Sequence, residues 1–451
     1  MSDTNNEFPA PRKIPNSTSK GRESLDFFRE QIEQHHSRFE ASIPLIASEN
    51  LVSKAAMDMF TTDLHNRYAE GLPGSRYYEG NEDYDPIEVH TEDLAKRLFN
   101  AAFADVRPIS GTAANISALF SLASPGDKFM APELAAGAHI STQRFGAAGL
   151  RGLNTITYPS LHETMSIDTD LAVKAILEEK PRICYVGQSV YLFPNDLKPI
   201  IEAAKEVGAS TMYDGAHVLG LIAGKQFQDP LGDGMDLITA STHKTFPGPQ
   251  HGVILGNNDV TLPNGKSLHK TIRSRVFPGV HSNHHLHKVA AFGVSLAEAI
   301  EFQEDYAKNI ITNAKALAEG LWNRGMKVFA AEQGFTESHT VLVDVTERGG
   351  GADVSKRAES QGLVMNKNML PGDTSAVKPS GIRLGTPEMT RLGMGADEMD
   401  EVAELIHLAS LGGKESEVRT RARALKNEFC KIHYCWSSKE NAYSQPKWTD
   451  L

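Results

Sequence analysis

Cysteine and long apolar runs are both scarce in this sequence. Its 451 residues include only three cysteines, Cys184, Cys430 and Cys435, which are too few and too scattered for a disulfide framework. No apolar run approaches the length of a membrane span, and the first twenty residues lack the apolar core of a secretory signal. We therefore expect a cytoplasmic protein in a reducing compartment, with no membrane partner.

An excess of positive charge is also missing. The chain has 46 Lys and Arg against 57 Asp and Glu, a formal net charge of −11, which argues against a nucleic-acid partner. Hydrophobic residues make up 40% and charged residues 23%, as in an ordinary globular protein. The length is enough for two or three domains, each with a full core.

Strand-like and helix-like segments alternate through the middle of the chain. "RICYVG" precedes the helical "DLKPIIEAAKEVGA", and "STMYDGA" and "DLITAS" follow as further strands. Such alternation predicts an α/β fold with a mostly parallel sheet covered by helices on both faces. After a long helical segment, "HTVLVDV" and "GIRLGT" predict strands of a smaller C-terminal α/β domain.

These patterns suggest five segments along the chain. We expect a disordered N-terminal arm at 1–22, an N-terminal helical segment at 23–60, a large domain at 61–300, a small C-terminal domain at 301–411, and a C-terminal extension at 412–451.

The stretch "ITASTHKTFPGPQHGVIL", residues 238–255, mounts one lysine between two short apolar runs that predict buried strands. Pro-Gly-Pro follows Lys244 closely, so the turn should be stiff, with Gly248 adopting a conformation closed to other residues. Solubility does not require such a rigid mount. A lysine that must form a bond in one geometry does.

Three polar signals fall where strands are expected to end, which is where ligands gather in open α/β sheets. Ser110-Gly111-Thr112 opens a helix and suits a phosphate, Asp214 ends one strand, and Lys244 ends the next. Singly, these residues are equally well a helix cap, a structural carboxylate and a surface lysine. Together they suit pyridoxal 5′-phosphate, whose aldehyde condenses with a lysine and whose pyridine nitrogen needs a carboxylate.

Several longer motifs resemble those of the serine hydroxymethyltransferase family, from about residue 23 to about residue 411. They are "LIASEN", "NRYAEGLPGSRYYEG", "SGTAAN", "DGAHVLGL", "STHKT" and "SGIRLGT". Those enzymes are fold-type I pyridoxal-phosphate proteins that move a one-carbon unit between serine and tetrahydrofolate. The resemblance implies this fold, this cofactor and this co-substrate. It also implies a homodimer with shared active sites, with a tetramer possible.

Matching motifs assign roles to individual residues. Lys244 would be the Schiff-base lysine, and Glu70 would be the acid/base near the transferred carbon, with Tyr68 close by. The implied cofactor-binding residues are Ser110, Gly111, Thr112, His139, Ser189, Asp214, His217, His243, Lys244, Ser282 and Asn283. Ser48, Tyr78 and Arg383 would bind the amino acid, Arg383 through its carboxylate. Glu70, Tyr77, Leu134 and Asn368 would contact folate.

The sequence departs from the family pattern close to this site. Gln250 and His251 replace an expected Arg-Gly after the lysine turn, and Ser282 and Asn283 stand where a Gly-Gly pair normally approaches the partner's cofactor phosphate. Similar changes occur in folate-independent threonine aldolases and transaldolases, although those relatives tend to lose the Tyr-Glu loop that this chain keeps. A 2-methylserine hydroxymethyltransferase is a further alternative, since room for one methyl group needs only a small pocket change.

A cluster of histidines supports a hypothesis from another class. "HSNHHLH" places His281, His284, His285 and His287 within seven residues, and histidines three or four apart on a helix can share a metal. A metal-binding protein is therefore an alternative. No carboxylate lies inside the cluster and no HExxH motif accompanies it, so we expect no metal.

Overall fold

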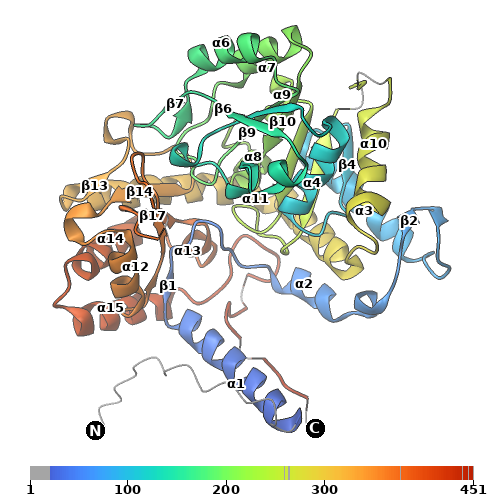
Figure 1. Cartoon of the computed structure of the whole chain (residues 1–451). Helices are drawn as coiled ribbons and strands as arrows, with labels where there is room; N and C mark the ends of the chain where they lie inside the picture. Colours follow the sequence, from blue (N-terminus) through green and yellow to red (C-terminus); the bar gives the residue numbers. More distant parts are fainter. Residues whose placement is uncertain are drawn as a thin grey trace.

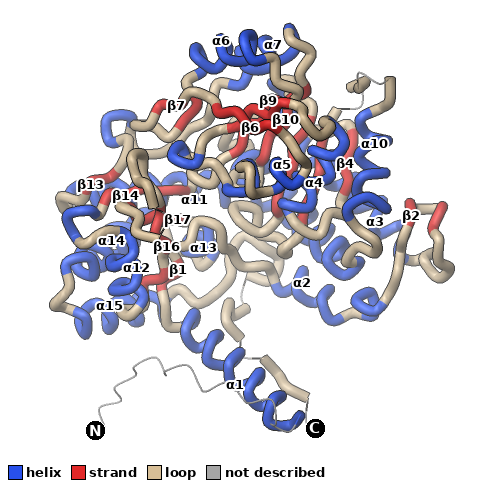
Figure 2. The backbone as a smooth tube through the Cα atoms, viewed as in Figure 1, coloured by secondary structure: helices blue, strands red, loops and turns tan. Residues whose placement is uncertain are grey.

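The computed structural model of the chain describes residues 21–257, 260–262, 265–375, 377–438, 440–444 and 446–449. It is an α/β structure in which helices surround two main sheets (Figures 1 and 2), as the sequence predicts. Nearly all of the predicted disordered arm, residues 1–20, lies outside the described residues.

The larger sheet has seven strands in the spatial order β4, β12, β11, β10, β9, β5, β6. Neighbouring strands pair in parallel except at β12, which is antiparallel to both β11 and β4. This confirms the mostly parallel sheet. The strands are β4 (Phe103–Asp105), β5 (Lys128–Ala131), β6 (Asn154–Thr157), β9 (Ile183–Gly187), β10 (Ser210–Asp214), β11 (Leu237–Ser241) and β12 (Gly252–Gly256).

Both faces of this sheet are buried because successive residues of a strand point to opposite sides. In β11, Ile238 and Ala240 enter a core with α3, α6, α7, α8 and α11, while Leu237 enters a second core with α4, α5 and α10. The helices are α3 (Tyr84–Phe99), α4 (Gly111–Leu122), α5 (Ala147–Leu150), α6 (Thr169–Glu179), α7 (Leu197–Glu206), α8 (Leu219–Ala223), α9 (Pro230–Asp233), α10 (Leu268–Ser274) and α11 (Leu286–Asn323).

Helix α11 joins the two sheets. Its 38 residues extend about 57 Å at 1.5 Å per residue. Phe292 and Leu296 pack in the core of the large sheet, whereas Leu317 and Leu321 pack in the core of the small one. The helix runs without a break through residue 300, so the domain boundary predicted there stays a prediction.

The smaller sheet is antiparallel throughout, in the order β13, β14, β17, β16. Its strands are β13 (Lys327–Val328), β14 (Thr340–Asp344), β16 (Asn366–Asn368) and β17 (Gly381–Gly385). The strands predicted in "HTVLVDV" and "GIRLGT" are therefore confirmed. The helices of this region are α12 (Gly351–Glu359), α13 (Pro387–Arg391), α14 (Ala396–Leu411) and α15 (Glu415–Glu428).

The N-terminal segment is helical only in part. Helix α1 (Gly21–Glu40) projects from the body of the molecule (Figure 1) and buries none of its side chains, with Phe28 62% and Ile32 40% exposed. The chain then leaves the helix to form β1 (Ile43–Pro44), which pairs in parallel with β15 (Leu363–Val364). Helix α2 (Lys54–Met57) follows.

The C-terminal extension folds back over the molecule after α15. Trp436 Nε1 donates to Glu301 on α11 at 2.9 Å, Arg391 Nη1 donates to the carbonyl of Tyr434 at 2.7 Å, and Trp448 Nε1 donates to Glu33 on α1 at 2.6 Å. The extension therefore ties α1, α11 and α13 together. Figure 1 shows the last described residues of the chain beside the far end of α1.

A buried polar cluster anchors this extension. The Tyr443 hydroxyl donates to the carboxylate of Glu388, and the Lys426 ammonium lies 4.0 Å from the centre of the Tyr443 ring. Burial raises the pKa of Glu388 to about 7 and lowers the pKa of Lys426 to about 8. Loss of one partner would leave a buried group without its hydrogen bond.

We expect Tyr443→Phe to lower the free energy of unfolding by about 1–3 kcal/mol, because Glu388 loses a buried donor. Urea unfolding at a pH above about 8, where Glu388 is ionised, measures this. Tyr77→Phe is the matched control, since Tyr77 is 76% exposed and its hydroxyl makes no hydrogen bond within the described residues. Equal effects of the two changes would contradict the prediction.

Candidate active site

Lys244 lies in a cavity of about 210 Å³ at the carboxyl ends of the parallel strands. Eight other residues predicted from the sequence line the same cavity: Ser110, Gly111, Thr112, His139, Ser189, Asp214, His217 and His243. Residues contributed by β9, β10, β11, α4 and the loops between them thus meet at one edge of the sheet, as the strand-end argument predicts.

The turn after Lys244 is held by hydrogen bonds to its own backbone. Thr242 Oγ1 donates to the carbonyl of Pro249 at 2.6 Å, and the Gly248 amide donates to the carbonyl of Thr242 at 2.9 Å. A Cβ on Gly248 would lie 2.6 Å from that carbonyl oxygen, and the φ of Gly248 is not left-handed. The expectation of a special backbone conformation at Gly248 was therefore wrong. Glycine is needed because the chain passes too close for a side chain.

A contact from the N-terminal segment also holds Lys244. Asn50 Nδ2 donates to the Lys244 carbonyl at 2.6 Å, and the Tyr306 hydroxyl donates to Asn50 Oδ1 at 3.1 Å. Neither Asn50 nor Tyr306 was predicted from the sequence, although Asn50 ends the quoted "LIASEN" motif.

Burial is the main cause that lowers the pKa of the Lys244 amine to about 8; Asp214 opposes the shift and Arg383 adds to it. A substantial fraction of the amine is therefore neutral near pH 8, as a nucleophile requires.

Asp214 is held as a fixed carboxylate. Its Oδ2 accepts from Asn115 Nδ2 at 2.7 Å and from the Tyr185 hydroxyl at 2.8 Å, and its Oδ1 accepts from the Ala216 amide at 2.9 Å. Gly187 makes room for this group, because a Cβ there would lie 2.6 Å from the Asp214 Cβ and 2.7 Å from the Tyr185 hydroxyl. One face of this carboxylate remains available to the cavity that it lines.

The start of α4 forms the opposite wall. Ser110 caps the helix by accepting from the Ala113 amide at 3.1 Å, and Gly111 packs so tightly that a Cβ would lie 2.9 Å from the Ser241 amide nitrogen. The exposed amides and the positive end of the helix dipole favour an anion here. Ser241 Oγ and His243 Nδ1 are buried in the same cavity and have no hydrogen-bond partner within the described residues.

Two predicted histidines in the cavity are neutral at pH 7. Burial lowers the pKa of His139, whose Nδ1 accepts from the Ser141 amide at 3.3 Å. Burial also holds the pKa of His217 well below its usual range, and its Nδ1 lies 3.2 Å from His339 Nε2. His339 directly precedes β14 of the small sheet, and burial lowers its pKa to about 3. Nothing in the sequence indicated that His339 contacts this site.

Arg383 reaches the cavity region from β17 of the small sheet. Its Nη1 donates to the carbonyl of Ser189 at 2.8 Å and its Nε to Asn366 Oδ1 at 3.2 Å. Burial lowers the pKa of Arg383 to about 10, so it remains charged at pH 7. No carboxylate pairs with Arg383 among the residues that the structure describes. The loop that holds Ser48 lies alongside, since the Gly385 amide donates to the Leu45 carbonyl at 2.8 Å.

The Tyr-Glu loop does not reach this cavity. Tyr68, Glu70, Tyr77 and Tyr78 all lie outside its lining, on and around the hairpin of β2 (Gly71–Leu72) and β3 (Ser75–Arg76). Figure 1 shows this hairpin at the edge of the molecule, far from β17. Tyr68 is 52%, Tyr77 76% and Tyr78 47% exposed.

Ser282 and Asn283 brace this loop within the same chain. The Ser282 hydroxyl donates to the Glu70 carboxylate. Asn283 accepts from the Ala69 amide at 2.9 Å and donates to the Arg67 carbonyl at 2.9 Å. The two residues that depart from the family pattern therefore fix the position of Glu70, a contact that the sequence did not indicate.

Comparison with known proteins agrees with this geometry. A family model described as serine hydroxymethyltransferase matches residues 25–406. Serine hydroxymethyltransferases of Thermoplasma volcanium and Picrophilus torridus are 51% and 50% identical to this chain, covering 90% and 91% of it and 95% and 94% of their own lengths. That of Methanopyrus kandleri is 47% identical over 93% of this chain and 97% of its own length. This chain belongs to the serine hydroxymethyltransferase family.

Serine hydroxymethyltransferases use pyridoxal phosphate, and the cavity residues fit that group. Lys244 supplies an amine with a lowered pKa, Asp214 a fixed carboxylate, and α4 an anion-binding helix end. Buried Ser241 Oγ and His243 Nδ1 offer further polar atoms to a bound ligand.

The remaining predicted contacts lie around this serine hydroxymethyltransferase site without lining it. Leu134 begins the short helix η3 (Leu134–Ala136), and Asn368 ends β16, where its Nδ2 donates to the Met369 carbonyl at 2.6 Å. His251, a departure from the family pattern, is buried with Nε2 2.6 Å from the Val106 carbonyl, and burial lowers its pKa to about 3. Gln250 is exposed.

The histidine cluster begins just before α11 and continues into its first turn. His284 Nε2 lies 2.8 Å from the Tyr84 hydroxyl and 3.0 Å from Glu88, and the His285 and His287 rings are 5.9 Å apart. Across the described ranges, no group of three or more His, Cys, Asp or Glu side chains is arranged to hold a metal ion. In the same part of the chain, none of the helices is both long and apolar enough to span a bilayer.

The pKa of Lys244 predicts how the apoenzyme captures pyridoxal phosphate. Because the neutral amine is the nucleophile, the capture rate should rise with pH through a midpoint of about 8, well below the 10.4 or so of a free lysine. Absorbance after rapid mixing, from about pH 6 to about pH 10, measures this.

Two variants serve as controls for this titration. Asp214→Asn removes the charge that raises the pKa of Lys244, so it should move the midpoint to lower pH. Lys244→Ala should abolish capture. A midpoint near that of free lysine would contradict the proposed desolvation.

Proposed function

We propose that this chain transfers the hydroxymethyl group of serine to tetrahydrofolate, leaving glycine, and catalyses the reverse reaction. The observation that carries the proposal is the guanidinium of Arg383, which is half-buried and charged without a carboxylate partner in the described structure. Burying a charge is costly unless an opposite charge compensates it, so this site suits a ligand with a carboxylate. An amino acid is such a ligand.

Pyridoxal phosphate supplies an aldehyde that condenses with the substrate amine and a ring that accepts the electron pair of a broken bond. Lys244 holds or accepts the proton that this exchange of amines requires, since its pKa is about 8. Asp214 stays fixed by three hydrogen bonds and stabilises positive charge at the ring nitrogen. Arg383, aided by Ser48, binds the substrate carboxylate and so orients the reacting carbon.

The other predicted roles belong to the same proposal. Ser110, Gly111 and Thr112 bind the phosphate at the start of α4, as its capped helix end favours. Neutral His139 would contact the ring face of the cofactor, and neutral His217 and Ser189 would lie by its hydroxyl group. His243 lines the same cavity beside Lys244. Folate is contacted by Glu70 and by three further residues, Tyr77, Leu134 and Asn368.

We also propose a homodimer in which each chain completes its partner's site. Glu70, Tyr68 and Tyr78 are required near the substrate, yet they lie outside their own chain's Lys244 cavity and are held together at an exposed edge. The exposed Phe28 and Ile32 on the projecting α1 offer apolar surface to a second copy. All three cysteines are free thiols, which suits the proposed cytoplasmic location.

Serine hydroxymethyl transfer predicts a folate-dependent spectroscopic response to glycine. Glycine added to the holoenzyme should produce a strong long-wavelength band only when tetrahydrofolate is present, and serine plus folate should yield glycine. A folate-independent response, with cleavage of threonine, would contradict the proposal and favour an aldolase. A stronger response to D-alanine would indicate a 2-methylserine substrate.

Arg383→Lys tests the carboxylate contact. A lysine keeps the charge but cannot form the two-pronged guanidinium–carboxylate pair, so KM for serine should rise about tenfold or more. Cofactor absorbance should be unchanged, because the proposed contact is to the substrate. Lys367→Arg, a charge-conserving change at an exposed position on the neighbouring strand β16, is the control and should leave KM unaltered.

Mixing two inactive variants tests the shared site. Lys244→Ala loses the amine and Glu70→Gln loses the acid/base, so each homodimer should be inactive. In a mixed dimer, one site combines an intact Lys244 with an intact Glu70 from the other chain. Random exchange of chains should therefore restore about a quarter of the activity. No recovery after exchange is verified by size-tagged chains would show that Glu70 acts within its own chain.

A further inference from the structure

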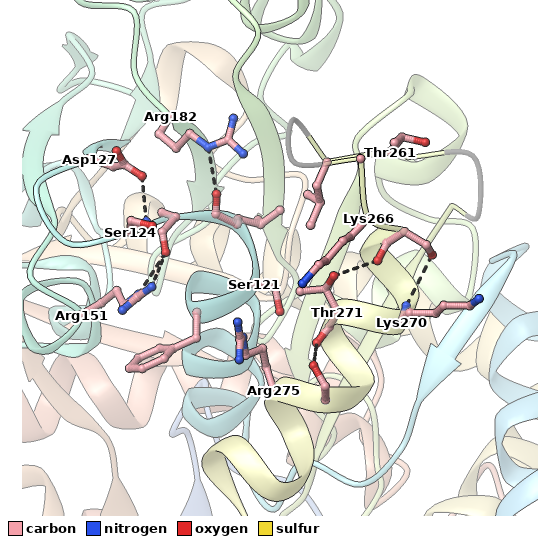
Figure 3. A pocket seen from close by; sticks show the side chains of 17 residues that line it. Ser121, Ser124, Asp127, Arg151, Arg182, Thr261, Lys266, Lys270, Thr271 and Arg275 are labelled. Carbon is pink, nitrogen blue, oxygen red and sulfur yellow. Dashed lines mark hydrogen bonds between the residues drawn. The ribbon is translucent and has the colours of Figure 1, made fainter.

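A second cavity, of about 1030 Å³, lies on the molecule away from Lys244. It is lined by the last residues of α4, whereas Ser110 at the start of α4 lines the Lys244 cavity. The 12 residues of α4 extend about 18 Å, so this length separates the two cavities. Figure 3 shows the second cavity from close by.

Basic side chains from separate segments surround this cavity. They come from the loop after α5, the start of β9, the loop before α10, α10 itself and the turn after it: Arg151, Arg182, Lys266, Lys270 and Arg275. Asp127 is the one carboxylate among the described lining residues, and its Oδ2 accepts from the Ser124 amide at 2.7 Å. This is a strongly positive site on a chain whose formal net charge is −11.

Four of the five cations of this cavity have no carboxylate partner in the part of the chain that the structure describes. Among the described residues, no carboxylate forms an ion pair with Arg151, Arg182, Lys270 or Arg275. Several other buried or half-buried arginines pair with carboxylates, as at Arg76–Glu88, Arg107–Asp105, Arg273–Glu92 and Arg324–Glu404. Arg383 and Arg391 have no carboxylate partner among the described residues. Four unpaired cations around one hollow repel one another, and an anionic ligand would relieve that repulsion.

Two of the arginines are already fixed in place. Arg151 donates from Nε and Nη2 to the Ala123 carbonyl, at 3.1 and 2.6 Å, and its guanidinium lies 4.3 Å from the centre of the Phe120 ring. Arg182 Nε donates to the Leu122 carbonyl at 2.9 Å. These bonds satisfy the last carbonyls of α4 and leave N–H groups on the other guanidinium nitrogens. An anion would therefore meet donors that lose little freedom on binding.

Hydroxyl groups complete the lining. Ser121, Ser124, Ser267 and Thr271 lie between the basic side chains, and Figure 3 shows Arg275 and Lys266 pointing into the space that they border. The volume matches that of sites for nucleotide-sized ligands and exceeds what a single phosphate needs. Guanidinium and ammonium groups interspersed with hydroxyls suit several phosphoryl groups in one molecule.

We propose that this cavity binds a small molecule carrying two or more linked phosphoryl groups. The site is separate from the cofactor-phosphate site at the other end of α4 and does not depend on the proposed transferase activity. A free polyphosphate and a nucleoside triphosphate share the required chemistry.

Calorimetric titration of the full-chain holoenzyme with inorganic tripolyphosphate tests the site. We expect one saturable site per chain, with binding that weakens as salt is added and is far stronger than for orthophosphate. ATP in place of tripolyphosphate distinguishes the sources: tighter binding of ATP would assign the ligand as a nucleotide, and equal binding would assign the phosphate chain alone.

Charge reversal locates the binding. Arg275→Glu and Lys270→Glu, both at exposed positions, should each weaken tripolyphosphate binding about tenfold or more. Lys174→Glu is the matched control on α6, outside the cavity lining, and should have no such effect. The milder Lys270→Gln replaces either variant if its circular dichroism shows that it has not folded.

Four results would overturn the proposal, three of them from the titrations with tripolyphosphate. They are the absence of saturable binding, an equal loss of affinity in Lys174→Glu, and binding that Arg275→Glu and Lys270→Glu leave intact. Binding of a single-stranded RNA without binding of tripolyphosphate would also overturn it, in favour of a macromolecular polyanion.

Discussion

Burial of positive charge is the constraint on which the active-site region depends. The Lys244 amine and the Arg383 guanidinium are both taken out of water, and burial lowers the pKa of each. Asp214 is the single carboxylate among the described residues that line the Lys244 cavity, and it is already engaged by Tyr185 and Asn115. Positive charge therefore exceeds negative charge around the cavity. A ligand with a phosphate and a carboxylate restores the balance, which is why cofactor and amino acid fit the same place.

That excess of charge requires precise backbone support. Lys244 is mounted by the Thr242–Pro249 and Gly248–Thr242 bonds from its own turn and by Asn50 from the N-terminal segment. Arg383 comes from the small sheet but is held by the carbonyl of Ser189 from the large part of the structure. The site is therefore shared between the two sheets. Helix α11 packs its side chains in both cores, and the C-terminal extension bonds to α11 and α13. Together they fix the position of one sheet relative to the other.

Some residues of this site can be predicted from the sequence because they stand at the ends of apolar runs, whereas others join the site only through the fold. Lys244, Asp214 and Ser110 sit at ends of apolar runs, so the general rule for α/β sheets brought them together correctly. Asn115 lies four residues after Gly111 on the same helix face, and that spacing was a usable signal. The contact between Tyr185 and Asp214 could not be predicted without the strand register, which pairs Gly187 with Asp214. His339 is far away in the chain, and only the folded structure places its ring 5.4 Å from that of His217.

The residues that depart from the family pattern also make contacts that the sequence did not predict. Loss of the Gly-Gly pair at Ser282 and Asn283 suggested only a changed contact to the cofactor phosphate. In the fold, these side chains bond to residues 67–70 of their own chain and so fix the carboxylate of Glu70. A glycine pair has no side chain to make these bonds. The substitutions therefore stiffen the loop that enters the neighbouring site in the proposed homodimer. Stiffening before association lowers the entropic cost of forming such a shared site. The replacement of the Gly-Gly pair by Ser282 and Asn283 is thus consistent with a retained transferase activity. In the proposed homodimer, the Tyr-Glu loop would already be held in place before the two chains associate.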